Sequence, residues 1–303
     1  MDCIGWEDEF PVTKQNKNGS SGQKNSSAHD YPIKIFTNIQ ENIENIKQLL
    51  KSPADLITRD FTAGSTDHPI AVIYIDGLVD KTLINEHIIR SIHQIPIYQN
   101  QGGTNDHMPA RHVEHRNSPR RRRSTHGQNL LNLLQSEILS VNEVNVEETL
   151  DKVVLGILSG NTALFVDGTD QVLMVETRGW AERAVQEPFT EVLIRGPRDG
   201  FNENIVTNMA HIRRDIRDPN LRMESRKIGR RSKKDLVIAY IEGIVHPQIL
   251  KELRRRLDTF DMDSAPESGY IEQWIEDSFL SPFPTLHHTE RPDKVSAALL
   301  NGK

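Results

Sequence analysis

The chain has 303 residues, of which 36% are hydrophobic, 26% charged and only 6% aromatic, and its formal net charge is −6. This length allows about two domains of ordinary size, and the acidic balance provides no global basic field for nucleic acid. The single cysteine, Cys3, excludes a disulfide scaffold. The longest apolar runs, such as Ile70–Ile75, have six residues, whereas a membrane-spanning helix needs about 20. We therefore expect a soluble intracellular protein of the α/β class without a secretory signal peptide.

Residues 1–34 are predicted to form a disordered tail. Within them, Thr13–Ser27 is, after its first residue, a run of Lys, Asn, Gln, Gly and Ser with almost nothing to bury. The first folded elements are expected to be an amphipathic helix at 38–51, a strand at 56–62 and a buried strand at 70–77. A second helix should follow the buried strand.

A low-complexity stretch at 97–128 interrupts this pattern and is predicted to be a flexible inserted loop. It contains four histidines and the run Arg120–Arg123, which would also suit a metal site or a patch for anionic lipid or nucleic acid. His112 and His115 lack a nearby Cys or carboxylate at a known ligand spacing, so we expect no metal and no other cofactor. The elements expected beyond the loop are a short helix near 129–135, a short strand at Val144, a helix ending at Gly160, and a hairpin with strands at 163–166 and 172–176.

An internal repeat is the most informative feature of the sequence. With a shift of 166 residues, 38–90 lies on 204–256 without a gap, and 11 of 53 positions are identical. Average composition would give about three identities. A second block, 148–160, matches 290–302 at an offset of 142, so the first copy carries 166 − 142 = 24 extra residues, which we assign to the loop.

The repeat predicts an α/β fold with two similar duplicated subdomains, each an open mixed sheet covered by helices. The first subdomain is expected at 35–177 and the second at 201–303, joined by a hinge segment at 178–200. The second copy reaches Gly302 without a counterpart of the hairpin at 163–176. We therefore expect the second subdomain to be truncated at its C-terminal hairpin.

Two acidic residues, Asp76 and Glu242, occupy equivalent positions after the buried strands, and each is followed by glycine. In open α/β sheets ligands gather beyond the carboxyl ends of strands, so these acids could face a ligand. The alternative, which we favour, is that they cap or bond the turn into the next helix.

The hinge segment concentrates charge, Gly and Pro around a tryptophan. Its side chains could bind an anion beside a helix N-terminus, or lock the two lobes through pairs between Arg and carboxylates, and we favour the lock. The candidates for ligand binding or inter-lobe contact are Arg178, Trp180, Arg183, Glu187, Arg195 and Arg198. The basic stretch Lys227–Lys234 is either a solvated turn or a surface for phosphate headgroups or a partner.

No catalytic constellation is evident. The sequence lacks Gly-x-Ser-x-Gly, a Walker loop, His-Glu-x-x-His and Cys-x-x-Cys. We therefore predict that the chain is not an enzyme, with a hydrolase that uses carboxylates near Asp76 as a remote alternative.

Eight segments together resemble a known family. They are Tyr74–Asp80, Arg178–Trp180, Gln186–Pro188, Ile194–Phe201, Ile228–Lys233, Glu267–Glu272, Ser281–Pro284 and Thr289–Val295. In combination they resemble the A subunit of GerA-family spore germinant receptors, from about residue 35 to the end of the chain. The family pattern continues into a membrane domain that this chain lacks. In addition, the inserted loop in the first copy of this chain is longer and more basic than the loop of the family pattern.

The resemblance implies the soluble N-terminal domain of a subunit in the inner spore membrane, on the side of the spore core. It also implies a transporter-like B subunit and a lipoprotein C subunit as partners, nutrient germinants as signals, and membrane attachment through the missing C-terminal portion. The leading hypothesis is a signalling and assembly domain with no nucleic-acid partner. The alternative is a small-molecule module that holds a germinant in the cleft between lobes.

Overall fold

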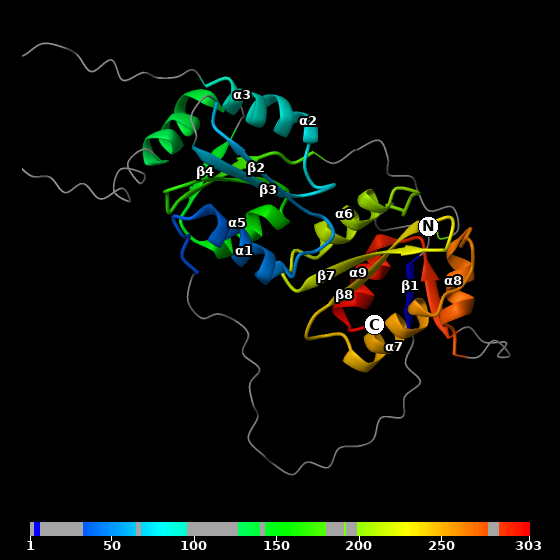
Figure 1. The fold of residues 1–303 in the computed structure, drawn as a ribbon. Coiled ribbons are helices and arrows are strands. Elements are labelled where there is room, and N and C mark those ends of the chain that lie inside the picture. Colours follow the sequence, from blue (N-terminus) through cyan, green and yellow to red (C-terminus); the bar gives the residue numbers. More distant parts are fainter. Residues whose placement is uncertain are drawn as a thin grey trace, which may run out of the picture. The chain divides into compact units, whose positions relative to one another are not determined.

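The computed structural model describes residues 3–6, 33–64, 68–95, 127–139, 143–179, 191, 199–277 and 285–303. The chain divides into two compact units (Figure 1). The first unit contains Ile33–Leu49 and Leu56–Trp180. The second unit contains Met1–Pro32, Leu50–Asp55 and Ala181–Lys303. The short segment Leu50–Asp55 therefore belongs to the second unit, although the chain on either side of it belongs to the first.

A five-stranded sheet forms the centre of the first unit. Its strands are β2 (Leu56–Thr62), β3 (Pro69–Ile75), β4 (Val144–Glu147), β5 (Asn161–Val166) and β6 (Val172–Glu176), in the order β2-β3-β5-β6-β4. All neighbouring strands are antiparallel, so the predicted mixed sheet is wrong. The helical connection from β4 through α5 (Leu150–Leu158) to β5 joins strands that run in the same direction. Because β6 lies between them, that connection creates no parallel ladder.

Helices cover both faces of this sheet. Residues 70–75 of β3 are all buried, as expected for a strand whose alternating side chains meet a packed layer on each side. In Figure 1, α1 (Ile39–Leu50) and α5 lie on one face. The other face carries one helical stretch formed by α2 (Lys81–Leu83), the π-helical η1 (Ile84–Ile89) and α3 (Arg90–His93), together with the helix 127–133 that continues into η2 (Leu134–Ile138). Ile88 and Leu131 from these helices join Val72 of β3 in one buried cluster.

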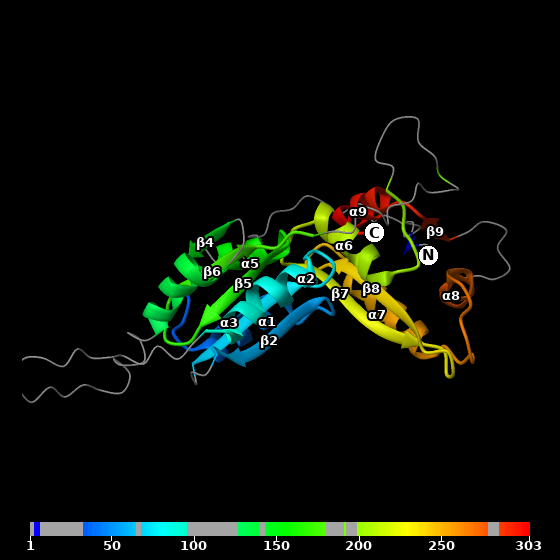
Figure 2. The same cartoon turned by 90° about the horizontal axis from the view of Figure 1, so that it is seen from above.

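The second unit is built around a long hairpin of β7 (Leu221–Ile228) and β8 (Lys234–Ile241), which Figure 2 shows with α7 along it. Its other elements are α6 (Ile205–Asp215), α7 (Pro247–Asp258), α8 (Ser268–Ile275), β9 (Leu286–Thr289) and α9 (Pro292–Leu300). One apolar cluster joins Ile238 to α7 and α8, and another joins Ile241 to α6 and α9. This hairpin is therefore also covered on both faces.

The N-terminal strand β1 (Cys3–Trp6) contradicts part of the predicted disordered tail at 1–34. It pairs antiparallel with β9, with Cys3 opposite Thr289 and Trp6 opposite Leu286. Composition predicts too little burial for independent folding, but an edge strand offers backbone donors and acceptors that four residues can satisfy without a core of their own. Residues 7–32 of the tail and 97–126 of the predicted loop lie outside the described part.

The stretches related by the offset of 166 contain the same order of helix, two antiparallel strands and helix. Asn38 accepts from the backbone N–H of Gln40 at 2.8 Å, and its counterpart Asn204 accepts from Val206 at 2.9 Å. Gly77 and Gly243 both have a φ near +85°, at 84° and 87°, a conformation that glycine adopts without strain.

The ungapped match does not extend to the pairing of the strands. Leu56 lies opposite Ile75 in the first hairpin, whereas Leu221, not the Arg222 that the offset predicts, lies opposite Ile241. The strands β2 and β7 are thus related by 165 residues. Turn geometry sets hairpin register, and an identity count does not detect a one-residue difference of this kind.

Candidate functional site

Five of the predicted site residues lie outside the described part of the chain: Trp180, Arg183, Glu187, Arg195 and Arg198. The other three are described. Asp76 and Arg178 lie in the first unit, and Glu242 lies in the second.

Asp76 lies at the turn between β3 and α2 and is paired within its own turn. Lys81 Nζ lies 2.7 Å from Asp76 Oδ1 and donates to Oδ2 at 3.0 Å. The following Asp80 caps α2, because its carboxylate accepts from the backbone N–H groups of Thr82 and Leu83 at 2.8 and 3.2 Å. Asp76 is thus paired with the first residue of the helix that follows its turn.

Arg178 has different partners from Asp76. It forms an isolated antiparallel bridge with Val79, and its guanidinium lies 4.0 Å from the Glu176 carboxylate. Beside it, the backbone N–H of Asp80 donates to Thr177 O at 2.8 Å. The segment that follows β6 is thus attached to the start of α2.

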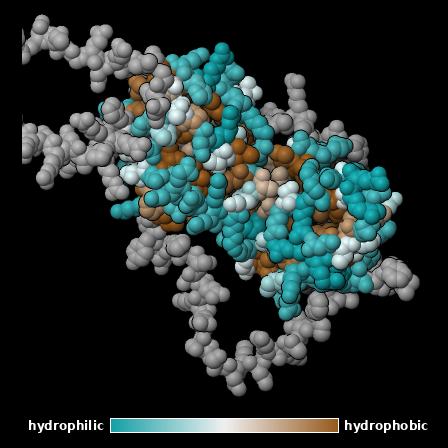
Figure 3. All heavy atoms as spheres, viewed as in Figure 1, coloured by the Kyte–Doolittle hydropathy of each residue, from teal (hydrophilic) through white to brown (hydrophobic). Residues whose placement is uncertain are grey.

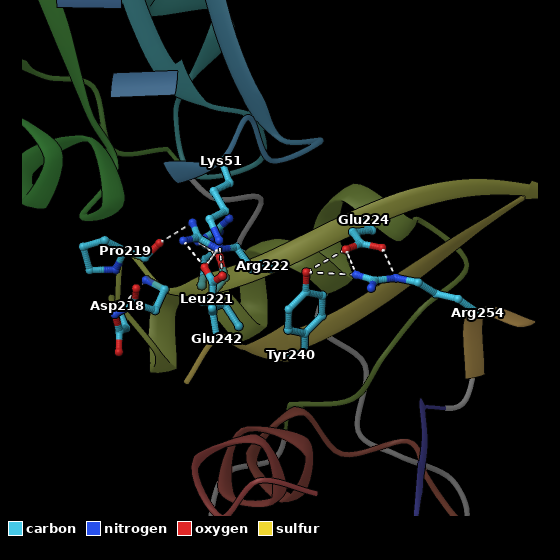
Figure 4. A network of polar contacts seen from close by, with 11 residues as sticks. Lys51, Asp218, Pro219, Leu221, Arg222, Glu224, Tyr240, Glu242 and Arg254 are labelled. Carbon is cyan, nitrogen blue, oxygen red and sulfur yellow. Dashed lines mark hydrogen bonds and ion pairs between the residues drawn. The ribbon is translucent and has the colours of Figure 1, made fainter. Parts of the chain in front are cut away.

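Glu242, at the end of β8, lies at the centre of a charged cluster (Figure 4). Arg222 of β7 donates to one carboxylate oxygen from Nε at 2.9 Å and from an η nitrogen at 2.6 Å. Lys51 pairs with the other oxygen. The same Arg222 donates to Pro219 O at 2.9 Å. The hydrogen bonds from Lys51 and Arg222 hold the pKa of Glu242 below its ordinary value.

A second cluster follows along the same hairpin (Figure 4). Tyr240 donates its hydroxyl proton to Glu224 at 2.7 Å, and Arg254 of α7 pairs with the same carboxylate. The Arg254 guanidinium also lies 5.6 Å from the centre of the Tyr240 ring. Burial opposes ionisation of Glu224, but the bonds from Arg254 and Tyr240 outweigh it and lower the pKa of Glu224. Burial and the adjacent carboxylate raise the pKa of Tyr240.

A fully buried ion pair fixes the segment Leu50–Asp55. Both side chains, Asp55 and Arg213, are 0% exposed. Arg213 donates from Nε to one carboxylate oxygen at 2.8 Å and from an η nitrogen to the other at 3.1 Å. A third donor reaches Leu221 O at 3.1 Å, and the backbone N–H of Ala54 donates to Met223 O at 3.2 Å. The segment therefore meets α6 with a salt bridge and β7 with a backbone hydrogen bond.

The basic stretch Lys227–Lys234 is largely engaged by nearby acceptors. Arg230 lies within 3.3 Å of Asp261 and 3.1 Å of Asp263, and Arg231 lies 3.3 Å from Asp263. Lys234 donates to Pro266 O at 2.7 Å. These contacts favour a neutralised turn over an open anion-binding surface.

Sequence reasoning missed the residues that organise these clusters, namely Asp55, Arg213, Arg222, Glu224 and Arg254. The signal at Arg213 is weak: it directly follows Ile212, on the apolar stripe of α6, and is as buried as that stripe. Its partner lies 158 residues away. No local spacing connects the two.

The described residues contain no group of three or more His, Cys, Asp or Glu side chains that could hold a metal ion. Likewise, none of the helices in the described ranges has both the length and the apolar content needed to cross a bilayer. Figure 3 shows hydrophilic side chains over much of the viewed surface, with hydrophobic ones in patches between them. The fold and site define an α/β domain braced by ion pairs.

Comparison with known proteins identifies the family. The model of the Bacillus/Clostridium GerA spore germination protein family matches residues 44–303. The chain therefore belongs to the GerA family.

Two relatives illustrate the similarity. The chain is 38% identical to Spore germination protein KA of Bacillus subtilis (strain 168) over 273 residues, which cover 90% of the chain and 45% of the relative. It is 35% identical to Spore germination protein GerLA of Bacillus cereus over 271 residues, covering 89% of the chain and 50% of the relative. The chain thus spans about half the length of these relatives.

A solved structure has the same fold. The crystal structure of the N-terminal domain of the A subunit of the Bacillus megaterium spore germinant receptor GerK3 matches with a TM-score of 0.63 and 32% identity. The match covers 90% of this chain and 91% of that one.

Proposed function

We propose that this chain is the N-terminal domain of a germinant receptor A subunit and takes part in the nutrient sensing and signal transduction that start spore germination. The observation that carries the proposal is the match over nine tenths of both chains to the N-terminal domain of such a subunit. The relatives named as spore germination proteins support the same role.

The proposal includes a receptor in the inner spore membrane, with this domain on the side of the spore core. Receptor B and C subunits would be its partners, and the membrane attachment would come from sequence beyond the matched half of the relatives. The half-length coverage of those relatives supports a domain that works as part of a larger subunit.

Within that receptor, we favour signalling and assembly over capture of a germinant. Within each of the two clusters on the β7–β8 hairpin, the charged side chains pair with one another. The Asp55–Arg213 pair is fully buried. Such a network stiffens the second unit, and a stiff body can transmit a displacement between partners. A germinant site would instead require polar groups that are available to a ligand.

We also infer that the two units are copies of one ancestral unit connected by the segment 178–200. The shared order of elements supports this duplication, as do the matching Asn38 and Asn204 caps.

The role in germination is tested in spores from which the other germinant receptor genes have been removed. Expression of the full-length protein should restore the fall in optical density after addition of at least one nutrient, whereas spores that lack its gene should stay bright. A variant with Lys51→Ala and Glu242→Ala should respond more slowly at equal protein level, with Lys152→Ala as a control at another lysine–glutamate pair, to Glu147. An unchanged response in spores without the gene would disprove the role.

The alternative, direct binding of a germinant, is tested by the melting temperature of the chain with amino acids, sugars and salts. A ligand that binds only the folded state raises the melting temperature. The signalling hypothesis predicts no saturable increase. A saturable increase with one nutrient would instead favour the binding module.

A further inference from the structure

The central hairpins of the two units differ in the number of strands that pair with their second strand, β3 or β8. In the first unit β3 pairs with β2 on one side and with β5 on the other. In the second unit β8 pairs with β7, and no other described strand pairs with it. Within the described residues, the second edge of β8 thus has no neighbour that corresponds to the β5 neighbour of its counterpart β3.

The backbone direction of β8 agrees with this comparison. The N–H of Glu242 donates to Asn220 O at 3.0 Å on the side of β7. Alternate residues of an antiparallel strand bond to the same neighbour, so Val237 and Ala239 direct their backbone groups to the other edge. The equivalent residues of β3, Ala71 and Ile73, lie opposite Phe165 and Ala163 of β5.

Side-chain exposure marks the same edge. Leu78, just after β3, is 1% exposed, whereas its counterpart Ile244 is 46% exposed. Leu158, at the end of α5, is 1% exposed, whereas its counterpart Leu300 at the end of α9 is 56% exposed. In the first unit the segment after β6 reaches Leu78, because the N–H of Gly179 donates to Leu78 O at 3.3 Å.

The backbone has the same left-handed conformation at the glycine that follows each of the helices α5 and α9. Gly160 and Gly302 have φ of 90° and 81°. A Cβ on Gly160 would lie 3.0 Å from Leu78 O, and a Cβ on Gly302 would lie 3.1 Å from Ile244 O. In the first unit β5 begins at the next residue, Asn161. Gly302 therefore directs the backbone toward the edge of β8, in the same way as Gly160 directs it toward the edge of β3.

The N-terminal strand β1 corresponds to β6 of the first unit. Leu286 of β9 pairs with Trp6 of β1, and its counterpart Val144 of β4 pairs with Val175 of β6. The first-unit order β2-β3-β5-β6-β4 then corresponds to β7, β8, no described strand, β1 and β9. Among the described residues of the second unit, the one strand without a match is therefore the counterpart of β5.

We propose that the open edge of β8 is a docking site for one apolar strand that runs antiparallel to β8 and completes a five-stranded sheet in the second unit. The occupant is the polypeptide that directly follows the counterpart of α9 in the longer relatives. The solved neighbour is the N-terminal domain of its subunit, and the relatives are about twice as long as the matched region, so such polypeptide exists in them. The strand must be apolar on both sides, because apolar clusters lie on both faces of β8. β5 meets this need, with five of its six residues buried.

The proposal is tested by extending the chain with its own sequence. A copy of Asn161–Val166 is added directly after Gly302, and amide hydrogen exchange is measured at Val237 and Ala239. We expect exchange at both amides to slow at least tenfold and the melting temperature of the second unit to rise. The matched control carries proline in place of Ala163 and Phe165 in the added copy, which removes the donors that face β8.

Three outcomes would overturn the proposal. Equal exchange in the extended chain and the proline control would show that the edge accepts no strand. Protection by the grafted strand, but not by the roughly 20 residues that follow the counterpart of α9 in a longer relative, would show that the occupant is wrong. Protection in the unextended chain that increases with protein concentration, together with a dimer in light scattering, would assign the edge to a second copy. None of these readouts depends on the role in germination.

Discussion

Breaking the buried Asp55–Arg213 pair is expected to destabilise the second unit severely. In Asp55→Asn the side chain keeps its size, but the Arg213 guanidinium, which is 0% exposed, loses its counter-charge. Removing one partner of a buried pair costs about 3–5 kcal/mol, because an uncompensated charge stays in a medium of low polarity. With a urea dependence of about 1–3 kcal/mol per M, a loss of about 3 kcal/mol lowers the unfolding midpoint by about 1–3 M.

The assay is urea unfolding monitored by tryptophan fluorescence. Trp274 of α8 lies in the second unit and reports on its unfolding. Asp258→Asn is the matched control, since Asp258 pairs with Arg226 at 2.5 Å but is 66% exposed. We expect this control to change the free energy of unfolding by less than about 1 kcal/mol. A double variant, Asp55→Leu with Arg213→Met, should recover most of the loss because no charge remains buried. A loss below 1 kcal/mol in Asp55→Asn, or a double variant as unstable as the single one, would refute the reasoning.

Three further predictions concern single positions. Tyr240→Phe removes a hydroxyl bonded to a half-buried carboxylate, and urea unfolding should show a loss of about 1.5 kcal/mol, whereas no change would mean that water replaces the bond. Burial and Arg214 lower the pKa of His211, so the unfolded state takes up a proton first below about pH 6.5. The free energy of unfolding should therefore fall as the pH drops from about 7 to 5, and the same fall in His211→Gln would contradict this. Gly179→Ala would place a Cβ 2.4 Å from the Asp80 side chain and should cost about 1–3 kcal/mol, whereas Gly269→Ala in α8 meets no atom within 4 Å and should be neutral or stabilising; equal melting temperatures for these two variants would disprove the predicted clash.

The sequence by itself determined most of the local elements. The apolar stripe that predicts a helix at 38–51 produces α1 at Ile39–Leu50, and the continuous apolar run at 70–75 produces β3. Hairpin signals around Gly168 predict the turn between β5 and β6. These features follow from periodicities of 3.6 and 2 and from turn chemistry, which act over a few neighbouring residues.

Tertiary structure alone decided the pairings between distant segments. Composition gives no reason for Cys3–Trp6 to be a strand, because the cause is the edge of β9, whose residues Leu286–Thr289 come 280 or more positions later. Antiparallel neighbours arise because β6 is placed between β4 and β5, although the order of elements along the chain is equally compatible with a mixed sheet. Asp55 is one of 43 acidic residues and Arg213 one of 37 basic ones, and nothing local selects this pair from the rest. Their match depends on where α6 packs, because only the folded core excludes the water that would otherwise solvate both charges.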